Sequence, residues 1–365
     1  MGQLEDFVRE EYRHREEVVR SHFAAEAPRL ARACHAMAER FARGGRILAF
    51  GLGAAATDAS HISVEFVHPV IVGKRALPAI ALPNDGPTSL GLAAEDTASV
   101  FARQIDALGL PEDIAIGLVL SPDDPSEPAV AAGIKQAAAK GMMTIALAGP
   151  YVGPGSHVRA READWLFTCD DRDPFVVQEV HETGYHMLWE LVHVFFEHKG
   201  LLVGRDAGPV HDAGASGFLY PFLAEAETNL DAVLSEVQGS VLKKAEDVIE
   251  IRAAGARADP TNLATTARVM AERFAAGGKL LAFGKPGDMA FAISTSGGSR
   301  NVLAALEEAR RRKMTCFGLA GYGGGPMVAR GLVDHCITID YEYIPRIQEA
   351  QASEYHILRR LIEMI

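Results

Sequence analysis

The sequence is poor in cysteine and contains no apolar run long enough to cross a bilayer. The first twenty residues also lack the apolar core of a signal peptide. The cysteines show no CxxC spacing, which is typical of buried, reduced thiols and excludes a disulfide framework or a zinc ribbon. We therefore expect a soluble, cytoplasmic protein. The four cysteines are Cys34, Cys169, Cys316 and Cys336.

Positive charge is also scarce. The chain has 36 Lys and Arg against 48 Asp and Glu, which gives a net charge of −12. Nucleic acids and anionic membranes attract clustered Lys and Arg, so we expect neither as a direct partner. The basic run RRRK at residues 310–313 is interpreted as the solvated end of a helix, where cations suit the helix dipole.

Short apolar runs alternate with helical patterns along the chain. Residues 4–41 have the three- and four-residue apolar spacing of helices and predict a helical hairpin, and residues 175–198 predict a long helix. Strands that alternate with helices predict an α/β fold, a three-layer α/β/α arrangement around a doubly wound parallel sheet. The predicted strands are residues 46–51, 79–82, 114–120, 144–148 and 165–168.

The sequence repeats itself once. MAERFARGG at residues 37–45 recurs as MAERFAAGG at 270–278, an offset of 233, whereas Asp113 matches Asp288, an offset of 175. The second copy therefore lacks about 58 residues, equivalent to about 54–111 of the first. We predict a first domain with an N-terminal helical segment at 1–199, a linker rich in Gly, Ala and Asp at 200–217, and a truncated second domain at 218–365.

The truncation constrains the second sheet. Only residues 285–287 separate the predicted strand 279–284 from the next strand, at 288–293. Parallel neighbours need a crossover of about a dozen residues or more, so the two strands cannot both keep parallel places. Either strand 279–284 is displaced or forms a hairpin, or the second sheet is partial, or the gene model is truncated.

The stretch ISTSGGSRN at 293–301 joins an apolar run to an amphipathic helix at 302–312. Glycines allow close approach of the backbone, serines donate hydrogen bonds, and the free N–H groups of a first helical turn point at a ligand. Each hydrogen bond to a charged oxygen contributes about 1.5–3 kcal/mol, so four or five hold a phosphate without a lysine. The alternative is a capped helix after a buried strand.

Together these patterns resemble two tandem sugar isomerase (SIS) domains, most closely those of phosphoheptose isomerases. The resemblance implies a flavodoxin-like SIS fold, a phosphosugar substrate and aldose–ketose isomerisation of sedoheptulose 7-phosphate or a similar sugar. It covers nearly the whole chain. The motifs that carry it are GGRILAFG and DASHISVEF in the first lobe, STSGGSRN in the second, and VVQEVHETGYH and RIQEAQASEYH at the lobe ends.

The resemblance implies a zinc site in the first lobe, with His61, Glu65, Gln178 and His186 as ligands and with Glu65 and His186 moving protons. His61 and Glu65 are four residues apart and share a helix face, as two ligands of one ion require. Gln178 and His186, eight residues apart, also share a face. Taken alone, an HxxxE pair is more often a surface ion pair.

In the second lobe the resemblance implies a phosphate site. Gln348 and His356 repeat the late Gln–His pair there, and His356 is a secondary candidate because its HxxxE partners belong to the missing block. The residues implied to hold phosphate are Ser294, Thr295, Ser296, Ser299 and Gln348.

The first lobe departs from the family pattern in two loops. Its glycine loop, GLGAA at 51–55, lacks the family's amide and serine, and its second loop, SPDDPSE at 121–127, carries two prolines and three carboxylates. Proline removes a donor, and one carboxylate about 4 Å from a phosphate charge costs roughly 4 kcal/mol at an effective dielectric of 20. We predict no phosphate there. A composite site across the lobes follows as an expectation, with the chain acting as an internal pseudo-dimer or assembling as a homo-oligomer.

Two functions are compatible with these residues. One is a zinc-dependent phosphosugar isomerase. The other is a phosphosugar-binding or regulatory SIS protein without turnover, which the loss of the sugar-facing loop favours.

Overall fold

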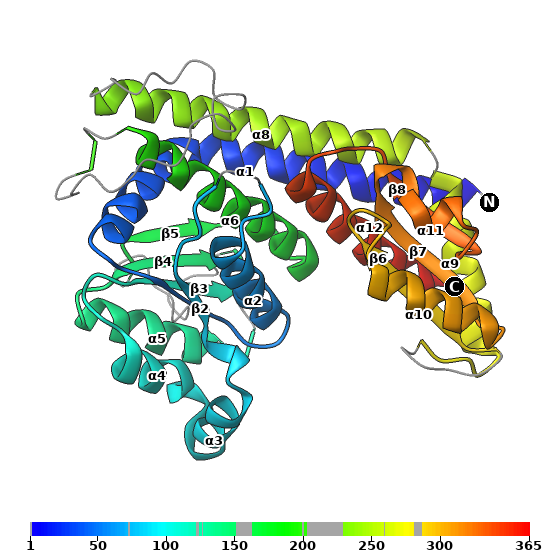
Figure 1. Cartoon of the computed structure of the whole chain (residues 1–365), viewed down its shortest axis with the longest axis horizontal. Helices are drawn as coiled ribbons and strands as arrows, with labels where there is room; N and C mark the ends of the chain where they lie inside the picture. The colour runs from blue at the N-terminus through cyan, green and yellow to red at the C-terminus, as the bar shows by residue number, and fades with distance from the viewer. Residues whose placement is uncertain are drawn as a thin grey trace. The chain divides into compact units, whose positions relative to one another are not determined.

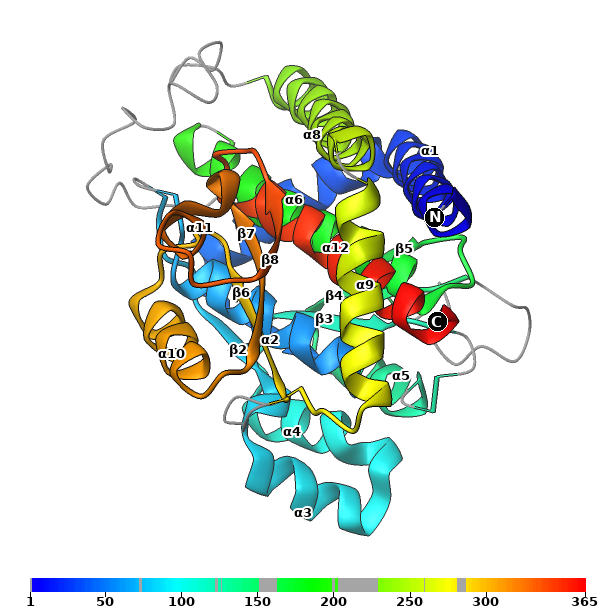
Figure 2. The same ribbon diagram turned by 90° about the vertical axis from the view of Figure 1, so that its right-hand side faces the viewer.

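The computed structural model describes residues 2–71, 74–121, 124–125, 127–150, 163–198, 201–202, 229–258, 260–280 and 287–365. The chain divides into two compact units, one formed by Met1–Arg20 with Ala245–Ile365 and the other by Ser21–Lys244. Figure 1 shows the elements in chain order, and Figure 2 shows them from the side. Among the described residues, none of the helices has the length and apolarity that a bilayer span demands.

Helix α1 (Gly2–Ala42) is one continuous helix, so the predicted hairpin is wrong. The apolar spacing runs through the whole segment with no glycine or turn sequence in its middle, and Pro28 is accommodated inside the helix. The helix ends at Ala42, and Gly44 in the turn that follows has φ = 90°, which would be strained with any side chain. Gly45 follows, and a Cβ there would lie 2.1 Å from the Glu112 carbonyl oxygen.

A five-stranded parallel sheet in the order β2-β1-β3-β4-β5 forms the centre of the unit Ser21–Lys244. This confirms the predicted fold class. The sheet lies between α5 (Glu127–Ala139) and α6 (Pro174–Glu197) in both ribbon views. The strands are β1 (Ile47–Phe50), β2 (Ala79–Ala81), β3 (Ile114–Val119), β4 (Met143–Ala148) and β5 (Trp165–Thr168).

Packing on the two sides of this sheet is apolar where helices meet strands. Phe50 of β1, Phe101 of α4 (Val100–Leu108) and Ile134 of α5 belong to one buried cluster. On the other side, α2 (Ala54–Val67) contacts both β1 and α6. The remaining helix between β2 and α4 is α3 (Gly86–Asp96).

The other unit contains a three-stranded parallel sheet in the order β6-β7-β8 within the described residues. Its strands are β6 (Met289–Ser294), β7 (Thr315–Gly321) and β8 (His335–Ile339). Among the described residues of the second half, the α-helices are α8 (Leu230–Ala258), α9 (Pro260–Ala275), α10 (Arg300–Arg311), α11 (Gly325–Ala329) and α12 (Ile344–Met364).

The same hydrogen bond recurs at corresponding places in the two sheets. Asp113 accepts from the backbone N–H of Arg46 at 3.0 Å, and Asp288 accepts from that of Lys279 at 3.0 Å. Leu280 then forms one parallel bridge to Met289. The start of the predicted strand 279–284 therefore lies parallel to β6, so the expectation that the two could not both be parallel is wrong at Leu280. Residues 281–284 lie outside the described part of the chain.

The predicted linker, 200–217, lies outside the described residues except for Leu201 and Leu202. The domain boundaries at 199/200 and 217/218 stay predictions. The compact units divide the chain elsewhere, after Arg20 and after Lys244, so α1 and α8 each contribute to both units.

Candidate functional site

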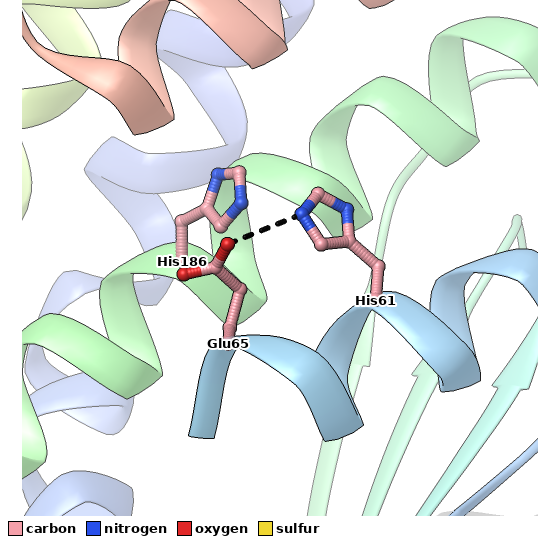
Figure 3. A group of neighbouring side chains, drawn as sticks. All are labelled: His61, Glu65 and His186. Carbon is pink, nitrogen blue, oxygen red and sulfur yellow. Dashed lines mark ion pairs between the residues drawn. The ribbon is translucent and has the colours of Figure 1, made fainter. Parts of the chain in front are cut away.

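Two helices bring three of the predicted metal ligands together. His61 and Glu65 project from α2 toward His186 on α6 (Figure 3). One ligand atom from each residue can be chosen so that all three atoms lie within 4.8 Å of one another. The i, i+4 spacing on α2 and the packing of α2 against α6 place these groups around one point, as the sequence predicts.

The cluster is largely removed from solvent. Glu65 is 2% exposed and His186 is fully buried. The Glu65 Oε1 atom lies 3.4 Å from His61 Nε2, whereas the second carboxylate oxygen, Oε2, is buried and has no hydrogen-bond partner among the described residues. A buried carboxylate oxygen without a donor is costly, because it has lost its water and gained nothing in exchange.

These residues fit a divalent metal. Two imidazoles and one carboxylate are the donor set that zinc takes in many proteins, and a cation beside Glu65 would offset the cost of burying its free oxygen. The fit rests on the geometry of this chain.

Gln178, the fourth predicted ligand, lies in the same helix-to-helix contact. Its side-chain amide donates to Asp58 Oδ2 at 3.0 Å, and both side chains are buried. Gln178 precedes His186 by two helical turns of α6, so the two residues share the face that α2 covers.

Sequence reasoning assigned no role to three further side chains at this contact. The Tyr185 hydroxyl lies 2.8 Å from His61 Nδ1 and 3.5 Å from Asp58 Oδ1. Glu182 Oε1 lies 3.6 Å from the same histidine nitrogen. The sequence did indicate Glu182, because residues 178, 182 and 186 follow one another at four-residue intervals and so share a helix face.

The carboxyl group of Asp58 is electrostatically perturbed. Burial raises its pKa from the ordinary value of 3.8 to about 7, and the charge of Glu182 acts in the same direction. The hydrogen bonds from Gln178 and Tyr185 oppose the rise, because they favour the ionised form. Asp58 thus accepts hydrogen bonds from Gln178 and Tyr185 in a site where burial disfavours its ionised form.

The contacts of His61 bear on its tautomer. Its Nε2 faces Glu65 and its Nδ1 faces Tyr185. If Nδ1–H donates to the Tyr185 oxygen, Nε2 carries a lone pair, and the Tyr185 hydroxyl is then free to donate toward Asp58. Metal-bound histidines usually have such a partner on the second nitrogen, which fixes the ring and its protonation.

The serine loop lies in the other unit, at the carboxyl end of β6. The Ser294 and Ser299 hydroxyl oxygens are 3.0 Å apart, and Ser296 Oγ accepts from the Gly298 N–H at 3.2 Å. Ser299 is the N-cap residue of α10 and makes no side-chain capping hydrogen bond. The first turn of α10 therefore lacks the side-chain cap that N-terminal N–H groups commonly receive.

Gly297 fixes the shape of this loop. Its φ is 61°, and a Cβ there would lie 2.1 Å from the Gly324 carbonyl oxygen. Its own carbonyl accepts from the Met327 N–H at 2.9 Å, and the Thr295 carbonyl accepts from the Gly321 N–H at 3.0 Å. Backbone hydrogen bonds therefore join the loops after β6 and β7, and there is no room for a side chain at Gly297.

Gln348 and His356 both lie on α12 in the same unit as the serine loop. The Gln348 amide oxygen is buried without a hydrogen-bond partner among the described residues, and His356 is 3% exposed. The roles of these two residues in binding stay predictions.

The two first-lobe loops that depart from the family pattern are partly visible. In the loop 121–127, the Asp124 N–H donates to the Ser121 carbonyl and the Glu127 N–H to the Asp124 carbonyl, while residues 122, 123 and 126 lie outside the described residues. In the glycine loop, Leu52 packs against the apolar core and Ala55 is fully buried. The prediction that loop 121–127 binds no phosphate stays a prediction.

Comparison with known proteins agrees with this fold. Residues 11–149 match the SIS domain family. Phosphoheptose isomerase from Desulfovibrio desulfuricans is 34% identical over 182 residues, which cover 49% of this chain and 83% of the relative. Phosphoheptose isomerase from Thermodesulfovibrio yellowstonii is 33% identical over 197 residues, covering 53% and 94%.

A solved structure extends the likeness in fold to most of the chain. The C-terminal domain of glucosamine-fructose-6-phosphate aminotransferase from Francisella tularensis matches with a TM-score of 0.52 and 12% identity, covering 97% of this chain and 95% of that one. At this identity the match concerns the fold alone. The chain belongs to the SIS domain family, and the two relatives named above, each matching about half of the chain, are phosphoheptose isomerases.

Proposed function

We propose that this protein is a metal-dependent isomerase of a sugar phosphate, with sedoheptulose 7-phosphate as the first substrate to test. The observation that carries the proposal is the cluster of His61, Glu65 and His186, whose ligand atoms lie within 4.8 Å of one another. Relatives named phosphoheptose isomerase, at 34% identity over about half of the chain, support the same reaction class.

The residues divide the chemistry between them. His61, Glu65, Gln178 and His186 would hold zinc, which when bound supplies a Lewis acid for a sugar carbonyl. Aldose–ketose isomerisation needs a proton moved between neighbouring carbons. The free, buried Oε2 atom of Glu65 is suited to take that proton, and His186 is the second candidate to return it.

The serine loop would hold the phosphate group. Ser294, Thr295, Ser296 and Ser299 surround the start of α10, and Ser299 leaves the first helical turn without a side-chain cap. Hydroxyls together with orphan N–H groups at a helix start bind anions in many proteins. Gln348, whose amide oxygen is buried, is proposed as a further polar contact for the substrate.

The experiment is to purify the full chain and measure its zinc content and its turnover of sedoheptulose 7-phosphate. His61→Ala should lose both. His68→Ala is the matched control, because His68 is the exposed C-cap residue of the same helix, α2, and lies outside the cluster. A wild-type chain that isomerises no phosphosugar, whether or not zinc is bound, contradicts the enzyme proposal.

The second candidate function is phosphosugar binding without turnover. The loop 51–55 favours it, because Leu52 and Ala55 face the apolar core and the loop offers no side-chain amide or hydroxyl to a sugar. Retained binding of sedoheptulose 7-phosphate by calorimetry, with no isomerised product after prolonged incubation with zinc, would favour this reading.

A further inference from the structure

The basic run at residues 310–313 separates into two pairs of side chains in the structure. Arg311 and Arg312 share one carboxylate on the surface of α10, because both pair with Glu308, at 2.6 Å in each case. Arg310 and Lys313 instead line a pocket of about 390 Å³. All four residues are exposed, as the interpretation as a solvated helix end expects, but Arg310 and Lys313 also line the pocket.

The pocket gathers cations from different elements. Arg273 comes from the last turn of α9, Arg310 from the last turn of α10, and Lys313 from the turn that follows α10. His335, the first residue of β8, adds an imidazole. The chain as a whole is acidic, with a net charge of −12, so a cluster of positive side chains departs from its overall charge balance.

Two of these cations are uncompensated. Within the part of the chain that the structure describes, the side chains of Arg273 and Lys313 form no ion pair or hydrogen bond. Arg310 pairs with Asp334 at 3.1 Å, and the second Asp334 oxygen accepts from the Cys316 N–H at 2.8 Å. The one carboxylate that faces the pocket is thereby occupied, and a charge of about two positive units remains.

The backbone at Lys313 supports the same conclusion. Lys313 has φ = 57°, at the position after a helix where glycine is usual, and its N–H closes the end of α10 on the Arg310 carbonyl at 2.9 Å. A lysine in this left-handed conformation is less favourable than glycine or asparagine. The turn places Lys313 among the residues that line the pocket.

The pocket is distinct from the serine loop. Thr315 and His335, which line it, are the first residues of β7 and β8, whereas the serine loop follows the last residue of β6. Because β6, β7 and β8 are parallel, the two places lie at opposite ends of one sheet. Seven residues of β7 separate the ends by about 20 Å, which one sugar phosphate cannot bridge.

We propose that the pocket lined by Arg273, Arg310 and Lys313 is a second anion site, which binds a small phosphomonoester. A phosphate dianion matches the two uncompensated charges, and a volume of about 390 Å³ leaves room for the organic part of the molecule. The binding is independent of the proposed isomerase activity, since none of its residues belongs to the metal cluster or the serine loop.

The test measures binding of glucose 6-phosphate and of inorganic phosphate to the full chain by calorimetry at constant ionic strength. All proteins carry Ser296→Asp, so that phosphate binding by the serine loop is weakened at least tenfold in every one of them. Arg273→Gln with Lys313→Asn removes both uncompensated cations, and asparagine tolerates the left-handed backbone. Arg311→Gln with Arg312→Gln removes the same charge from the same helix end, outside the pocket.

We expect the Ser296→Asp chain to bind glucose 6-phosphate, and more tightly than inorganic phosphate. The pocket variant should bind at least tenfold more weakly, and the Arg311/Arg312 variant less than twofold more weakly. Absence of binding in the Ser296→Asp chain overturns the proposal, as does an equal loss in both double variants. Equal affinity for the two ligands would refute the phosphomonoester assignment. Circular dichroism confirms that each variant is folded.

Discussion

Tyr185→Phe isolates the role of one hydroxyl at the candidate metal site. The substitution keeps the ring, which packs edge-on against His61 at 5.3 Å and against His186 at 5.1 Å between centroids. It removes the oxygen that lies 2.8 Å from His61 Nδ1. The remaining polar group near that nitrogen is Glu182 Oε1, at 3.6 Å, beyond good hydrogen-bond distance.

The magnitude follows from this loss. Removing the partner of a metal-bound histidine typically weakens metal binding about 10- to 100-fold, equivalent to about 1.4–2.7 kcal/mol. Folding stability should fall by only about 1 kcal/mol, the net contribution of one ordinary hydrogen bond. We therefore expect a large change in zinc affinity beside a small change in the unfolding midpoint.

The assay is zinc titration against a competing chelator, with urea unfolding of the zinc-free protein measured in parallel. Tyr322→Phe is the matched control, because it also removes one hydroxyl, which donates to the Glu342 carbonyl at 2.6 Å, outside the cluster. If Tyr185→Phe binds zinc within twofold of the wild type, the reasoning about the His61 tautomer is refuted. A loss of zinc matched by the control would also refute it.

Three further predictions follow from described contacts. Ser296→Asp should weaken phosphosugar binding to the serine loop at least tenfold by calorimetry, because a carboxylate about 4 Å from the phosphate costs roughly 4 kcal/mol. Ser235→Asp, on an exposed face of α8, should leave this binding unchanged. Burial lowers the pKa of His22 to about 4 and that of His181 to about 3. Both are neutral in the fold, so their contribution to stability is full above pH 6.5 and is lost as the pH falls toward 4 and then 3. The loss is up to about 1.4 kcal/mol per pH unit for each histidine. A melting temperature that does not change between pH 6.5 and pH 3, or that falls with pH as steeply in His181→Gln as in the wild type, would contradict this prediction. Asp113→Ala should lower the free energy of unfolding in urea by about 3 kcal/mol, because the buried carboxylate accepts from the Arg46 and Leu110 N–H groups at 3.0 Å. Asp340→Ala, at an exposed aspartate, is the control, and an equally small effect of both substitutions would count against the prediction.

Much of the fold could be predicted from the sequence because its signals are local. The five strands of the first sheet begin and end within one or two residues of the predicted ranges, since each is an apolar run bounded by turn residues. The hairpin at residues 4–41 was wrong because apolar spacing alone does not distinguish one long helix from two short ones.

The metal cluster was predictable for a different reason. His61 and Glu65 share a helix face by spacing alone, and the motif that resembles SIS domains linked them to His186 on a distant helix. Tyr185 and Asp58 were not assigned, because their importance depends on how α2 packs against α6. Helical spacing shows which side chains share a face, but not which atoms of two helices meet.

The hydrogen bond that Asp113 and Asp288 each make spans very different lengths of intervening chain. The aspartate closes a loop of 67 residues in the first sheet and one of 9 in the second. The entropy of closing the longer loop exceeds that of the shorter one by only about 2 kcal/mol, since it grows with the logarithm of length. A carboxylate that accepts from a backbone N–H can thus join residues 67 or 9 positions apart with little difference in the entropic cost of loop closure.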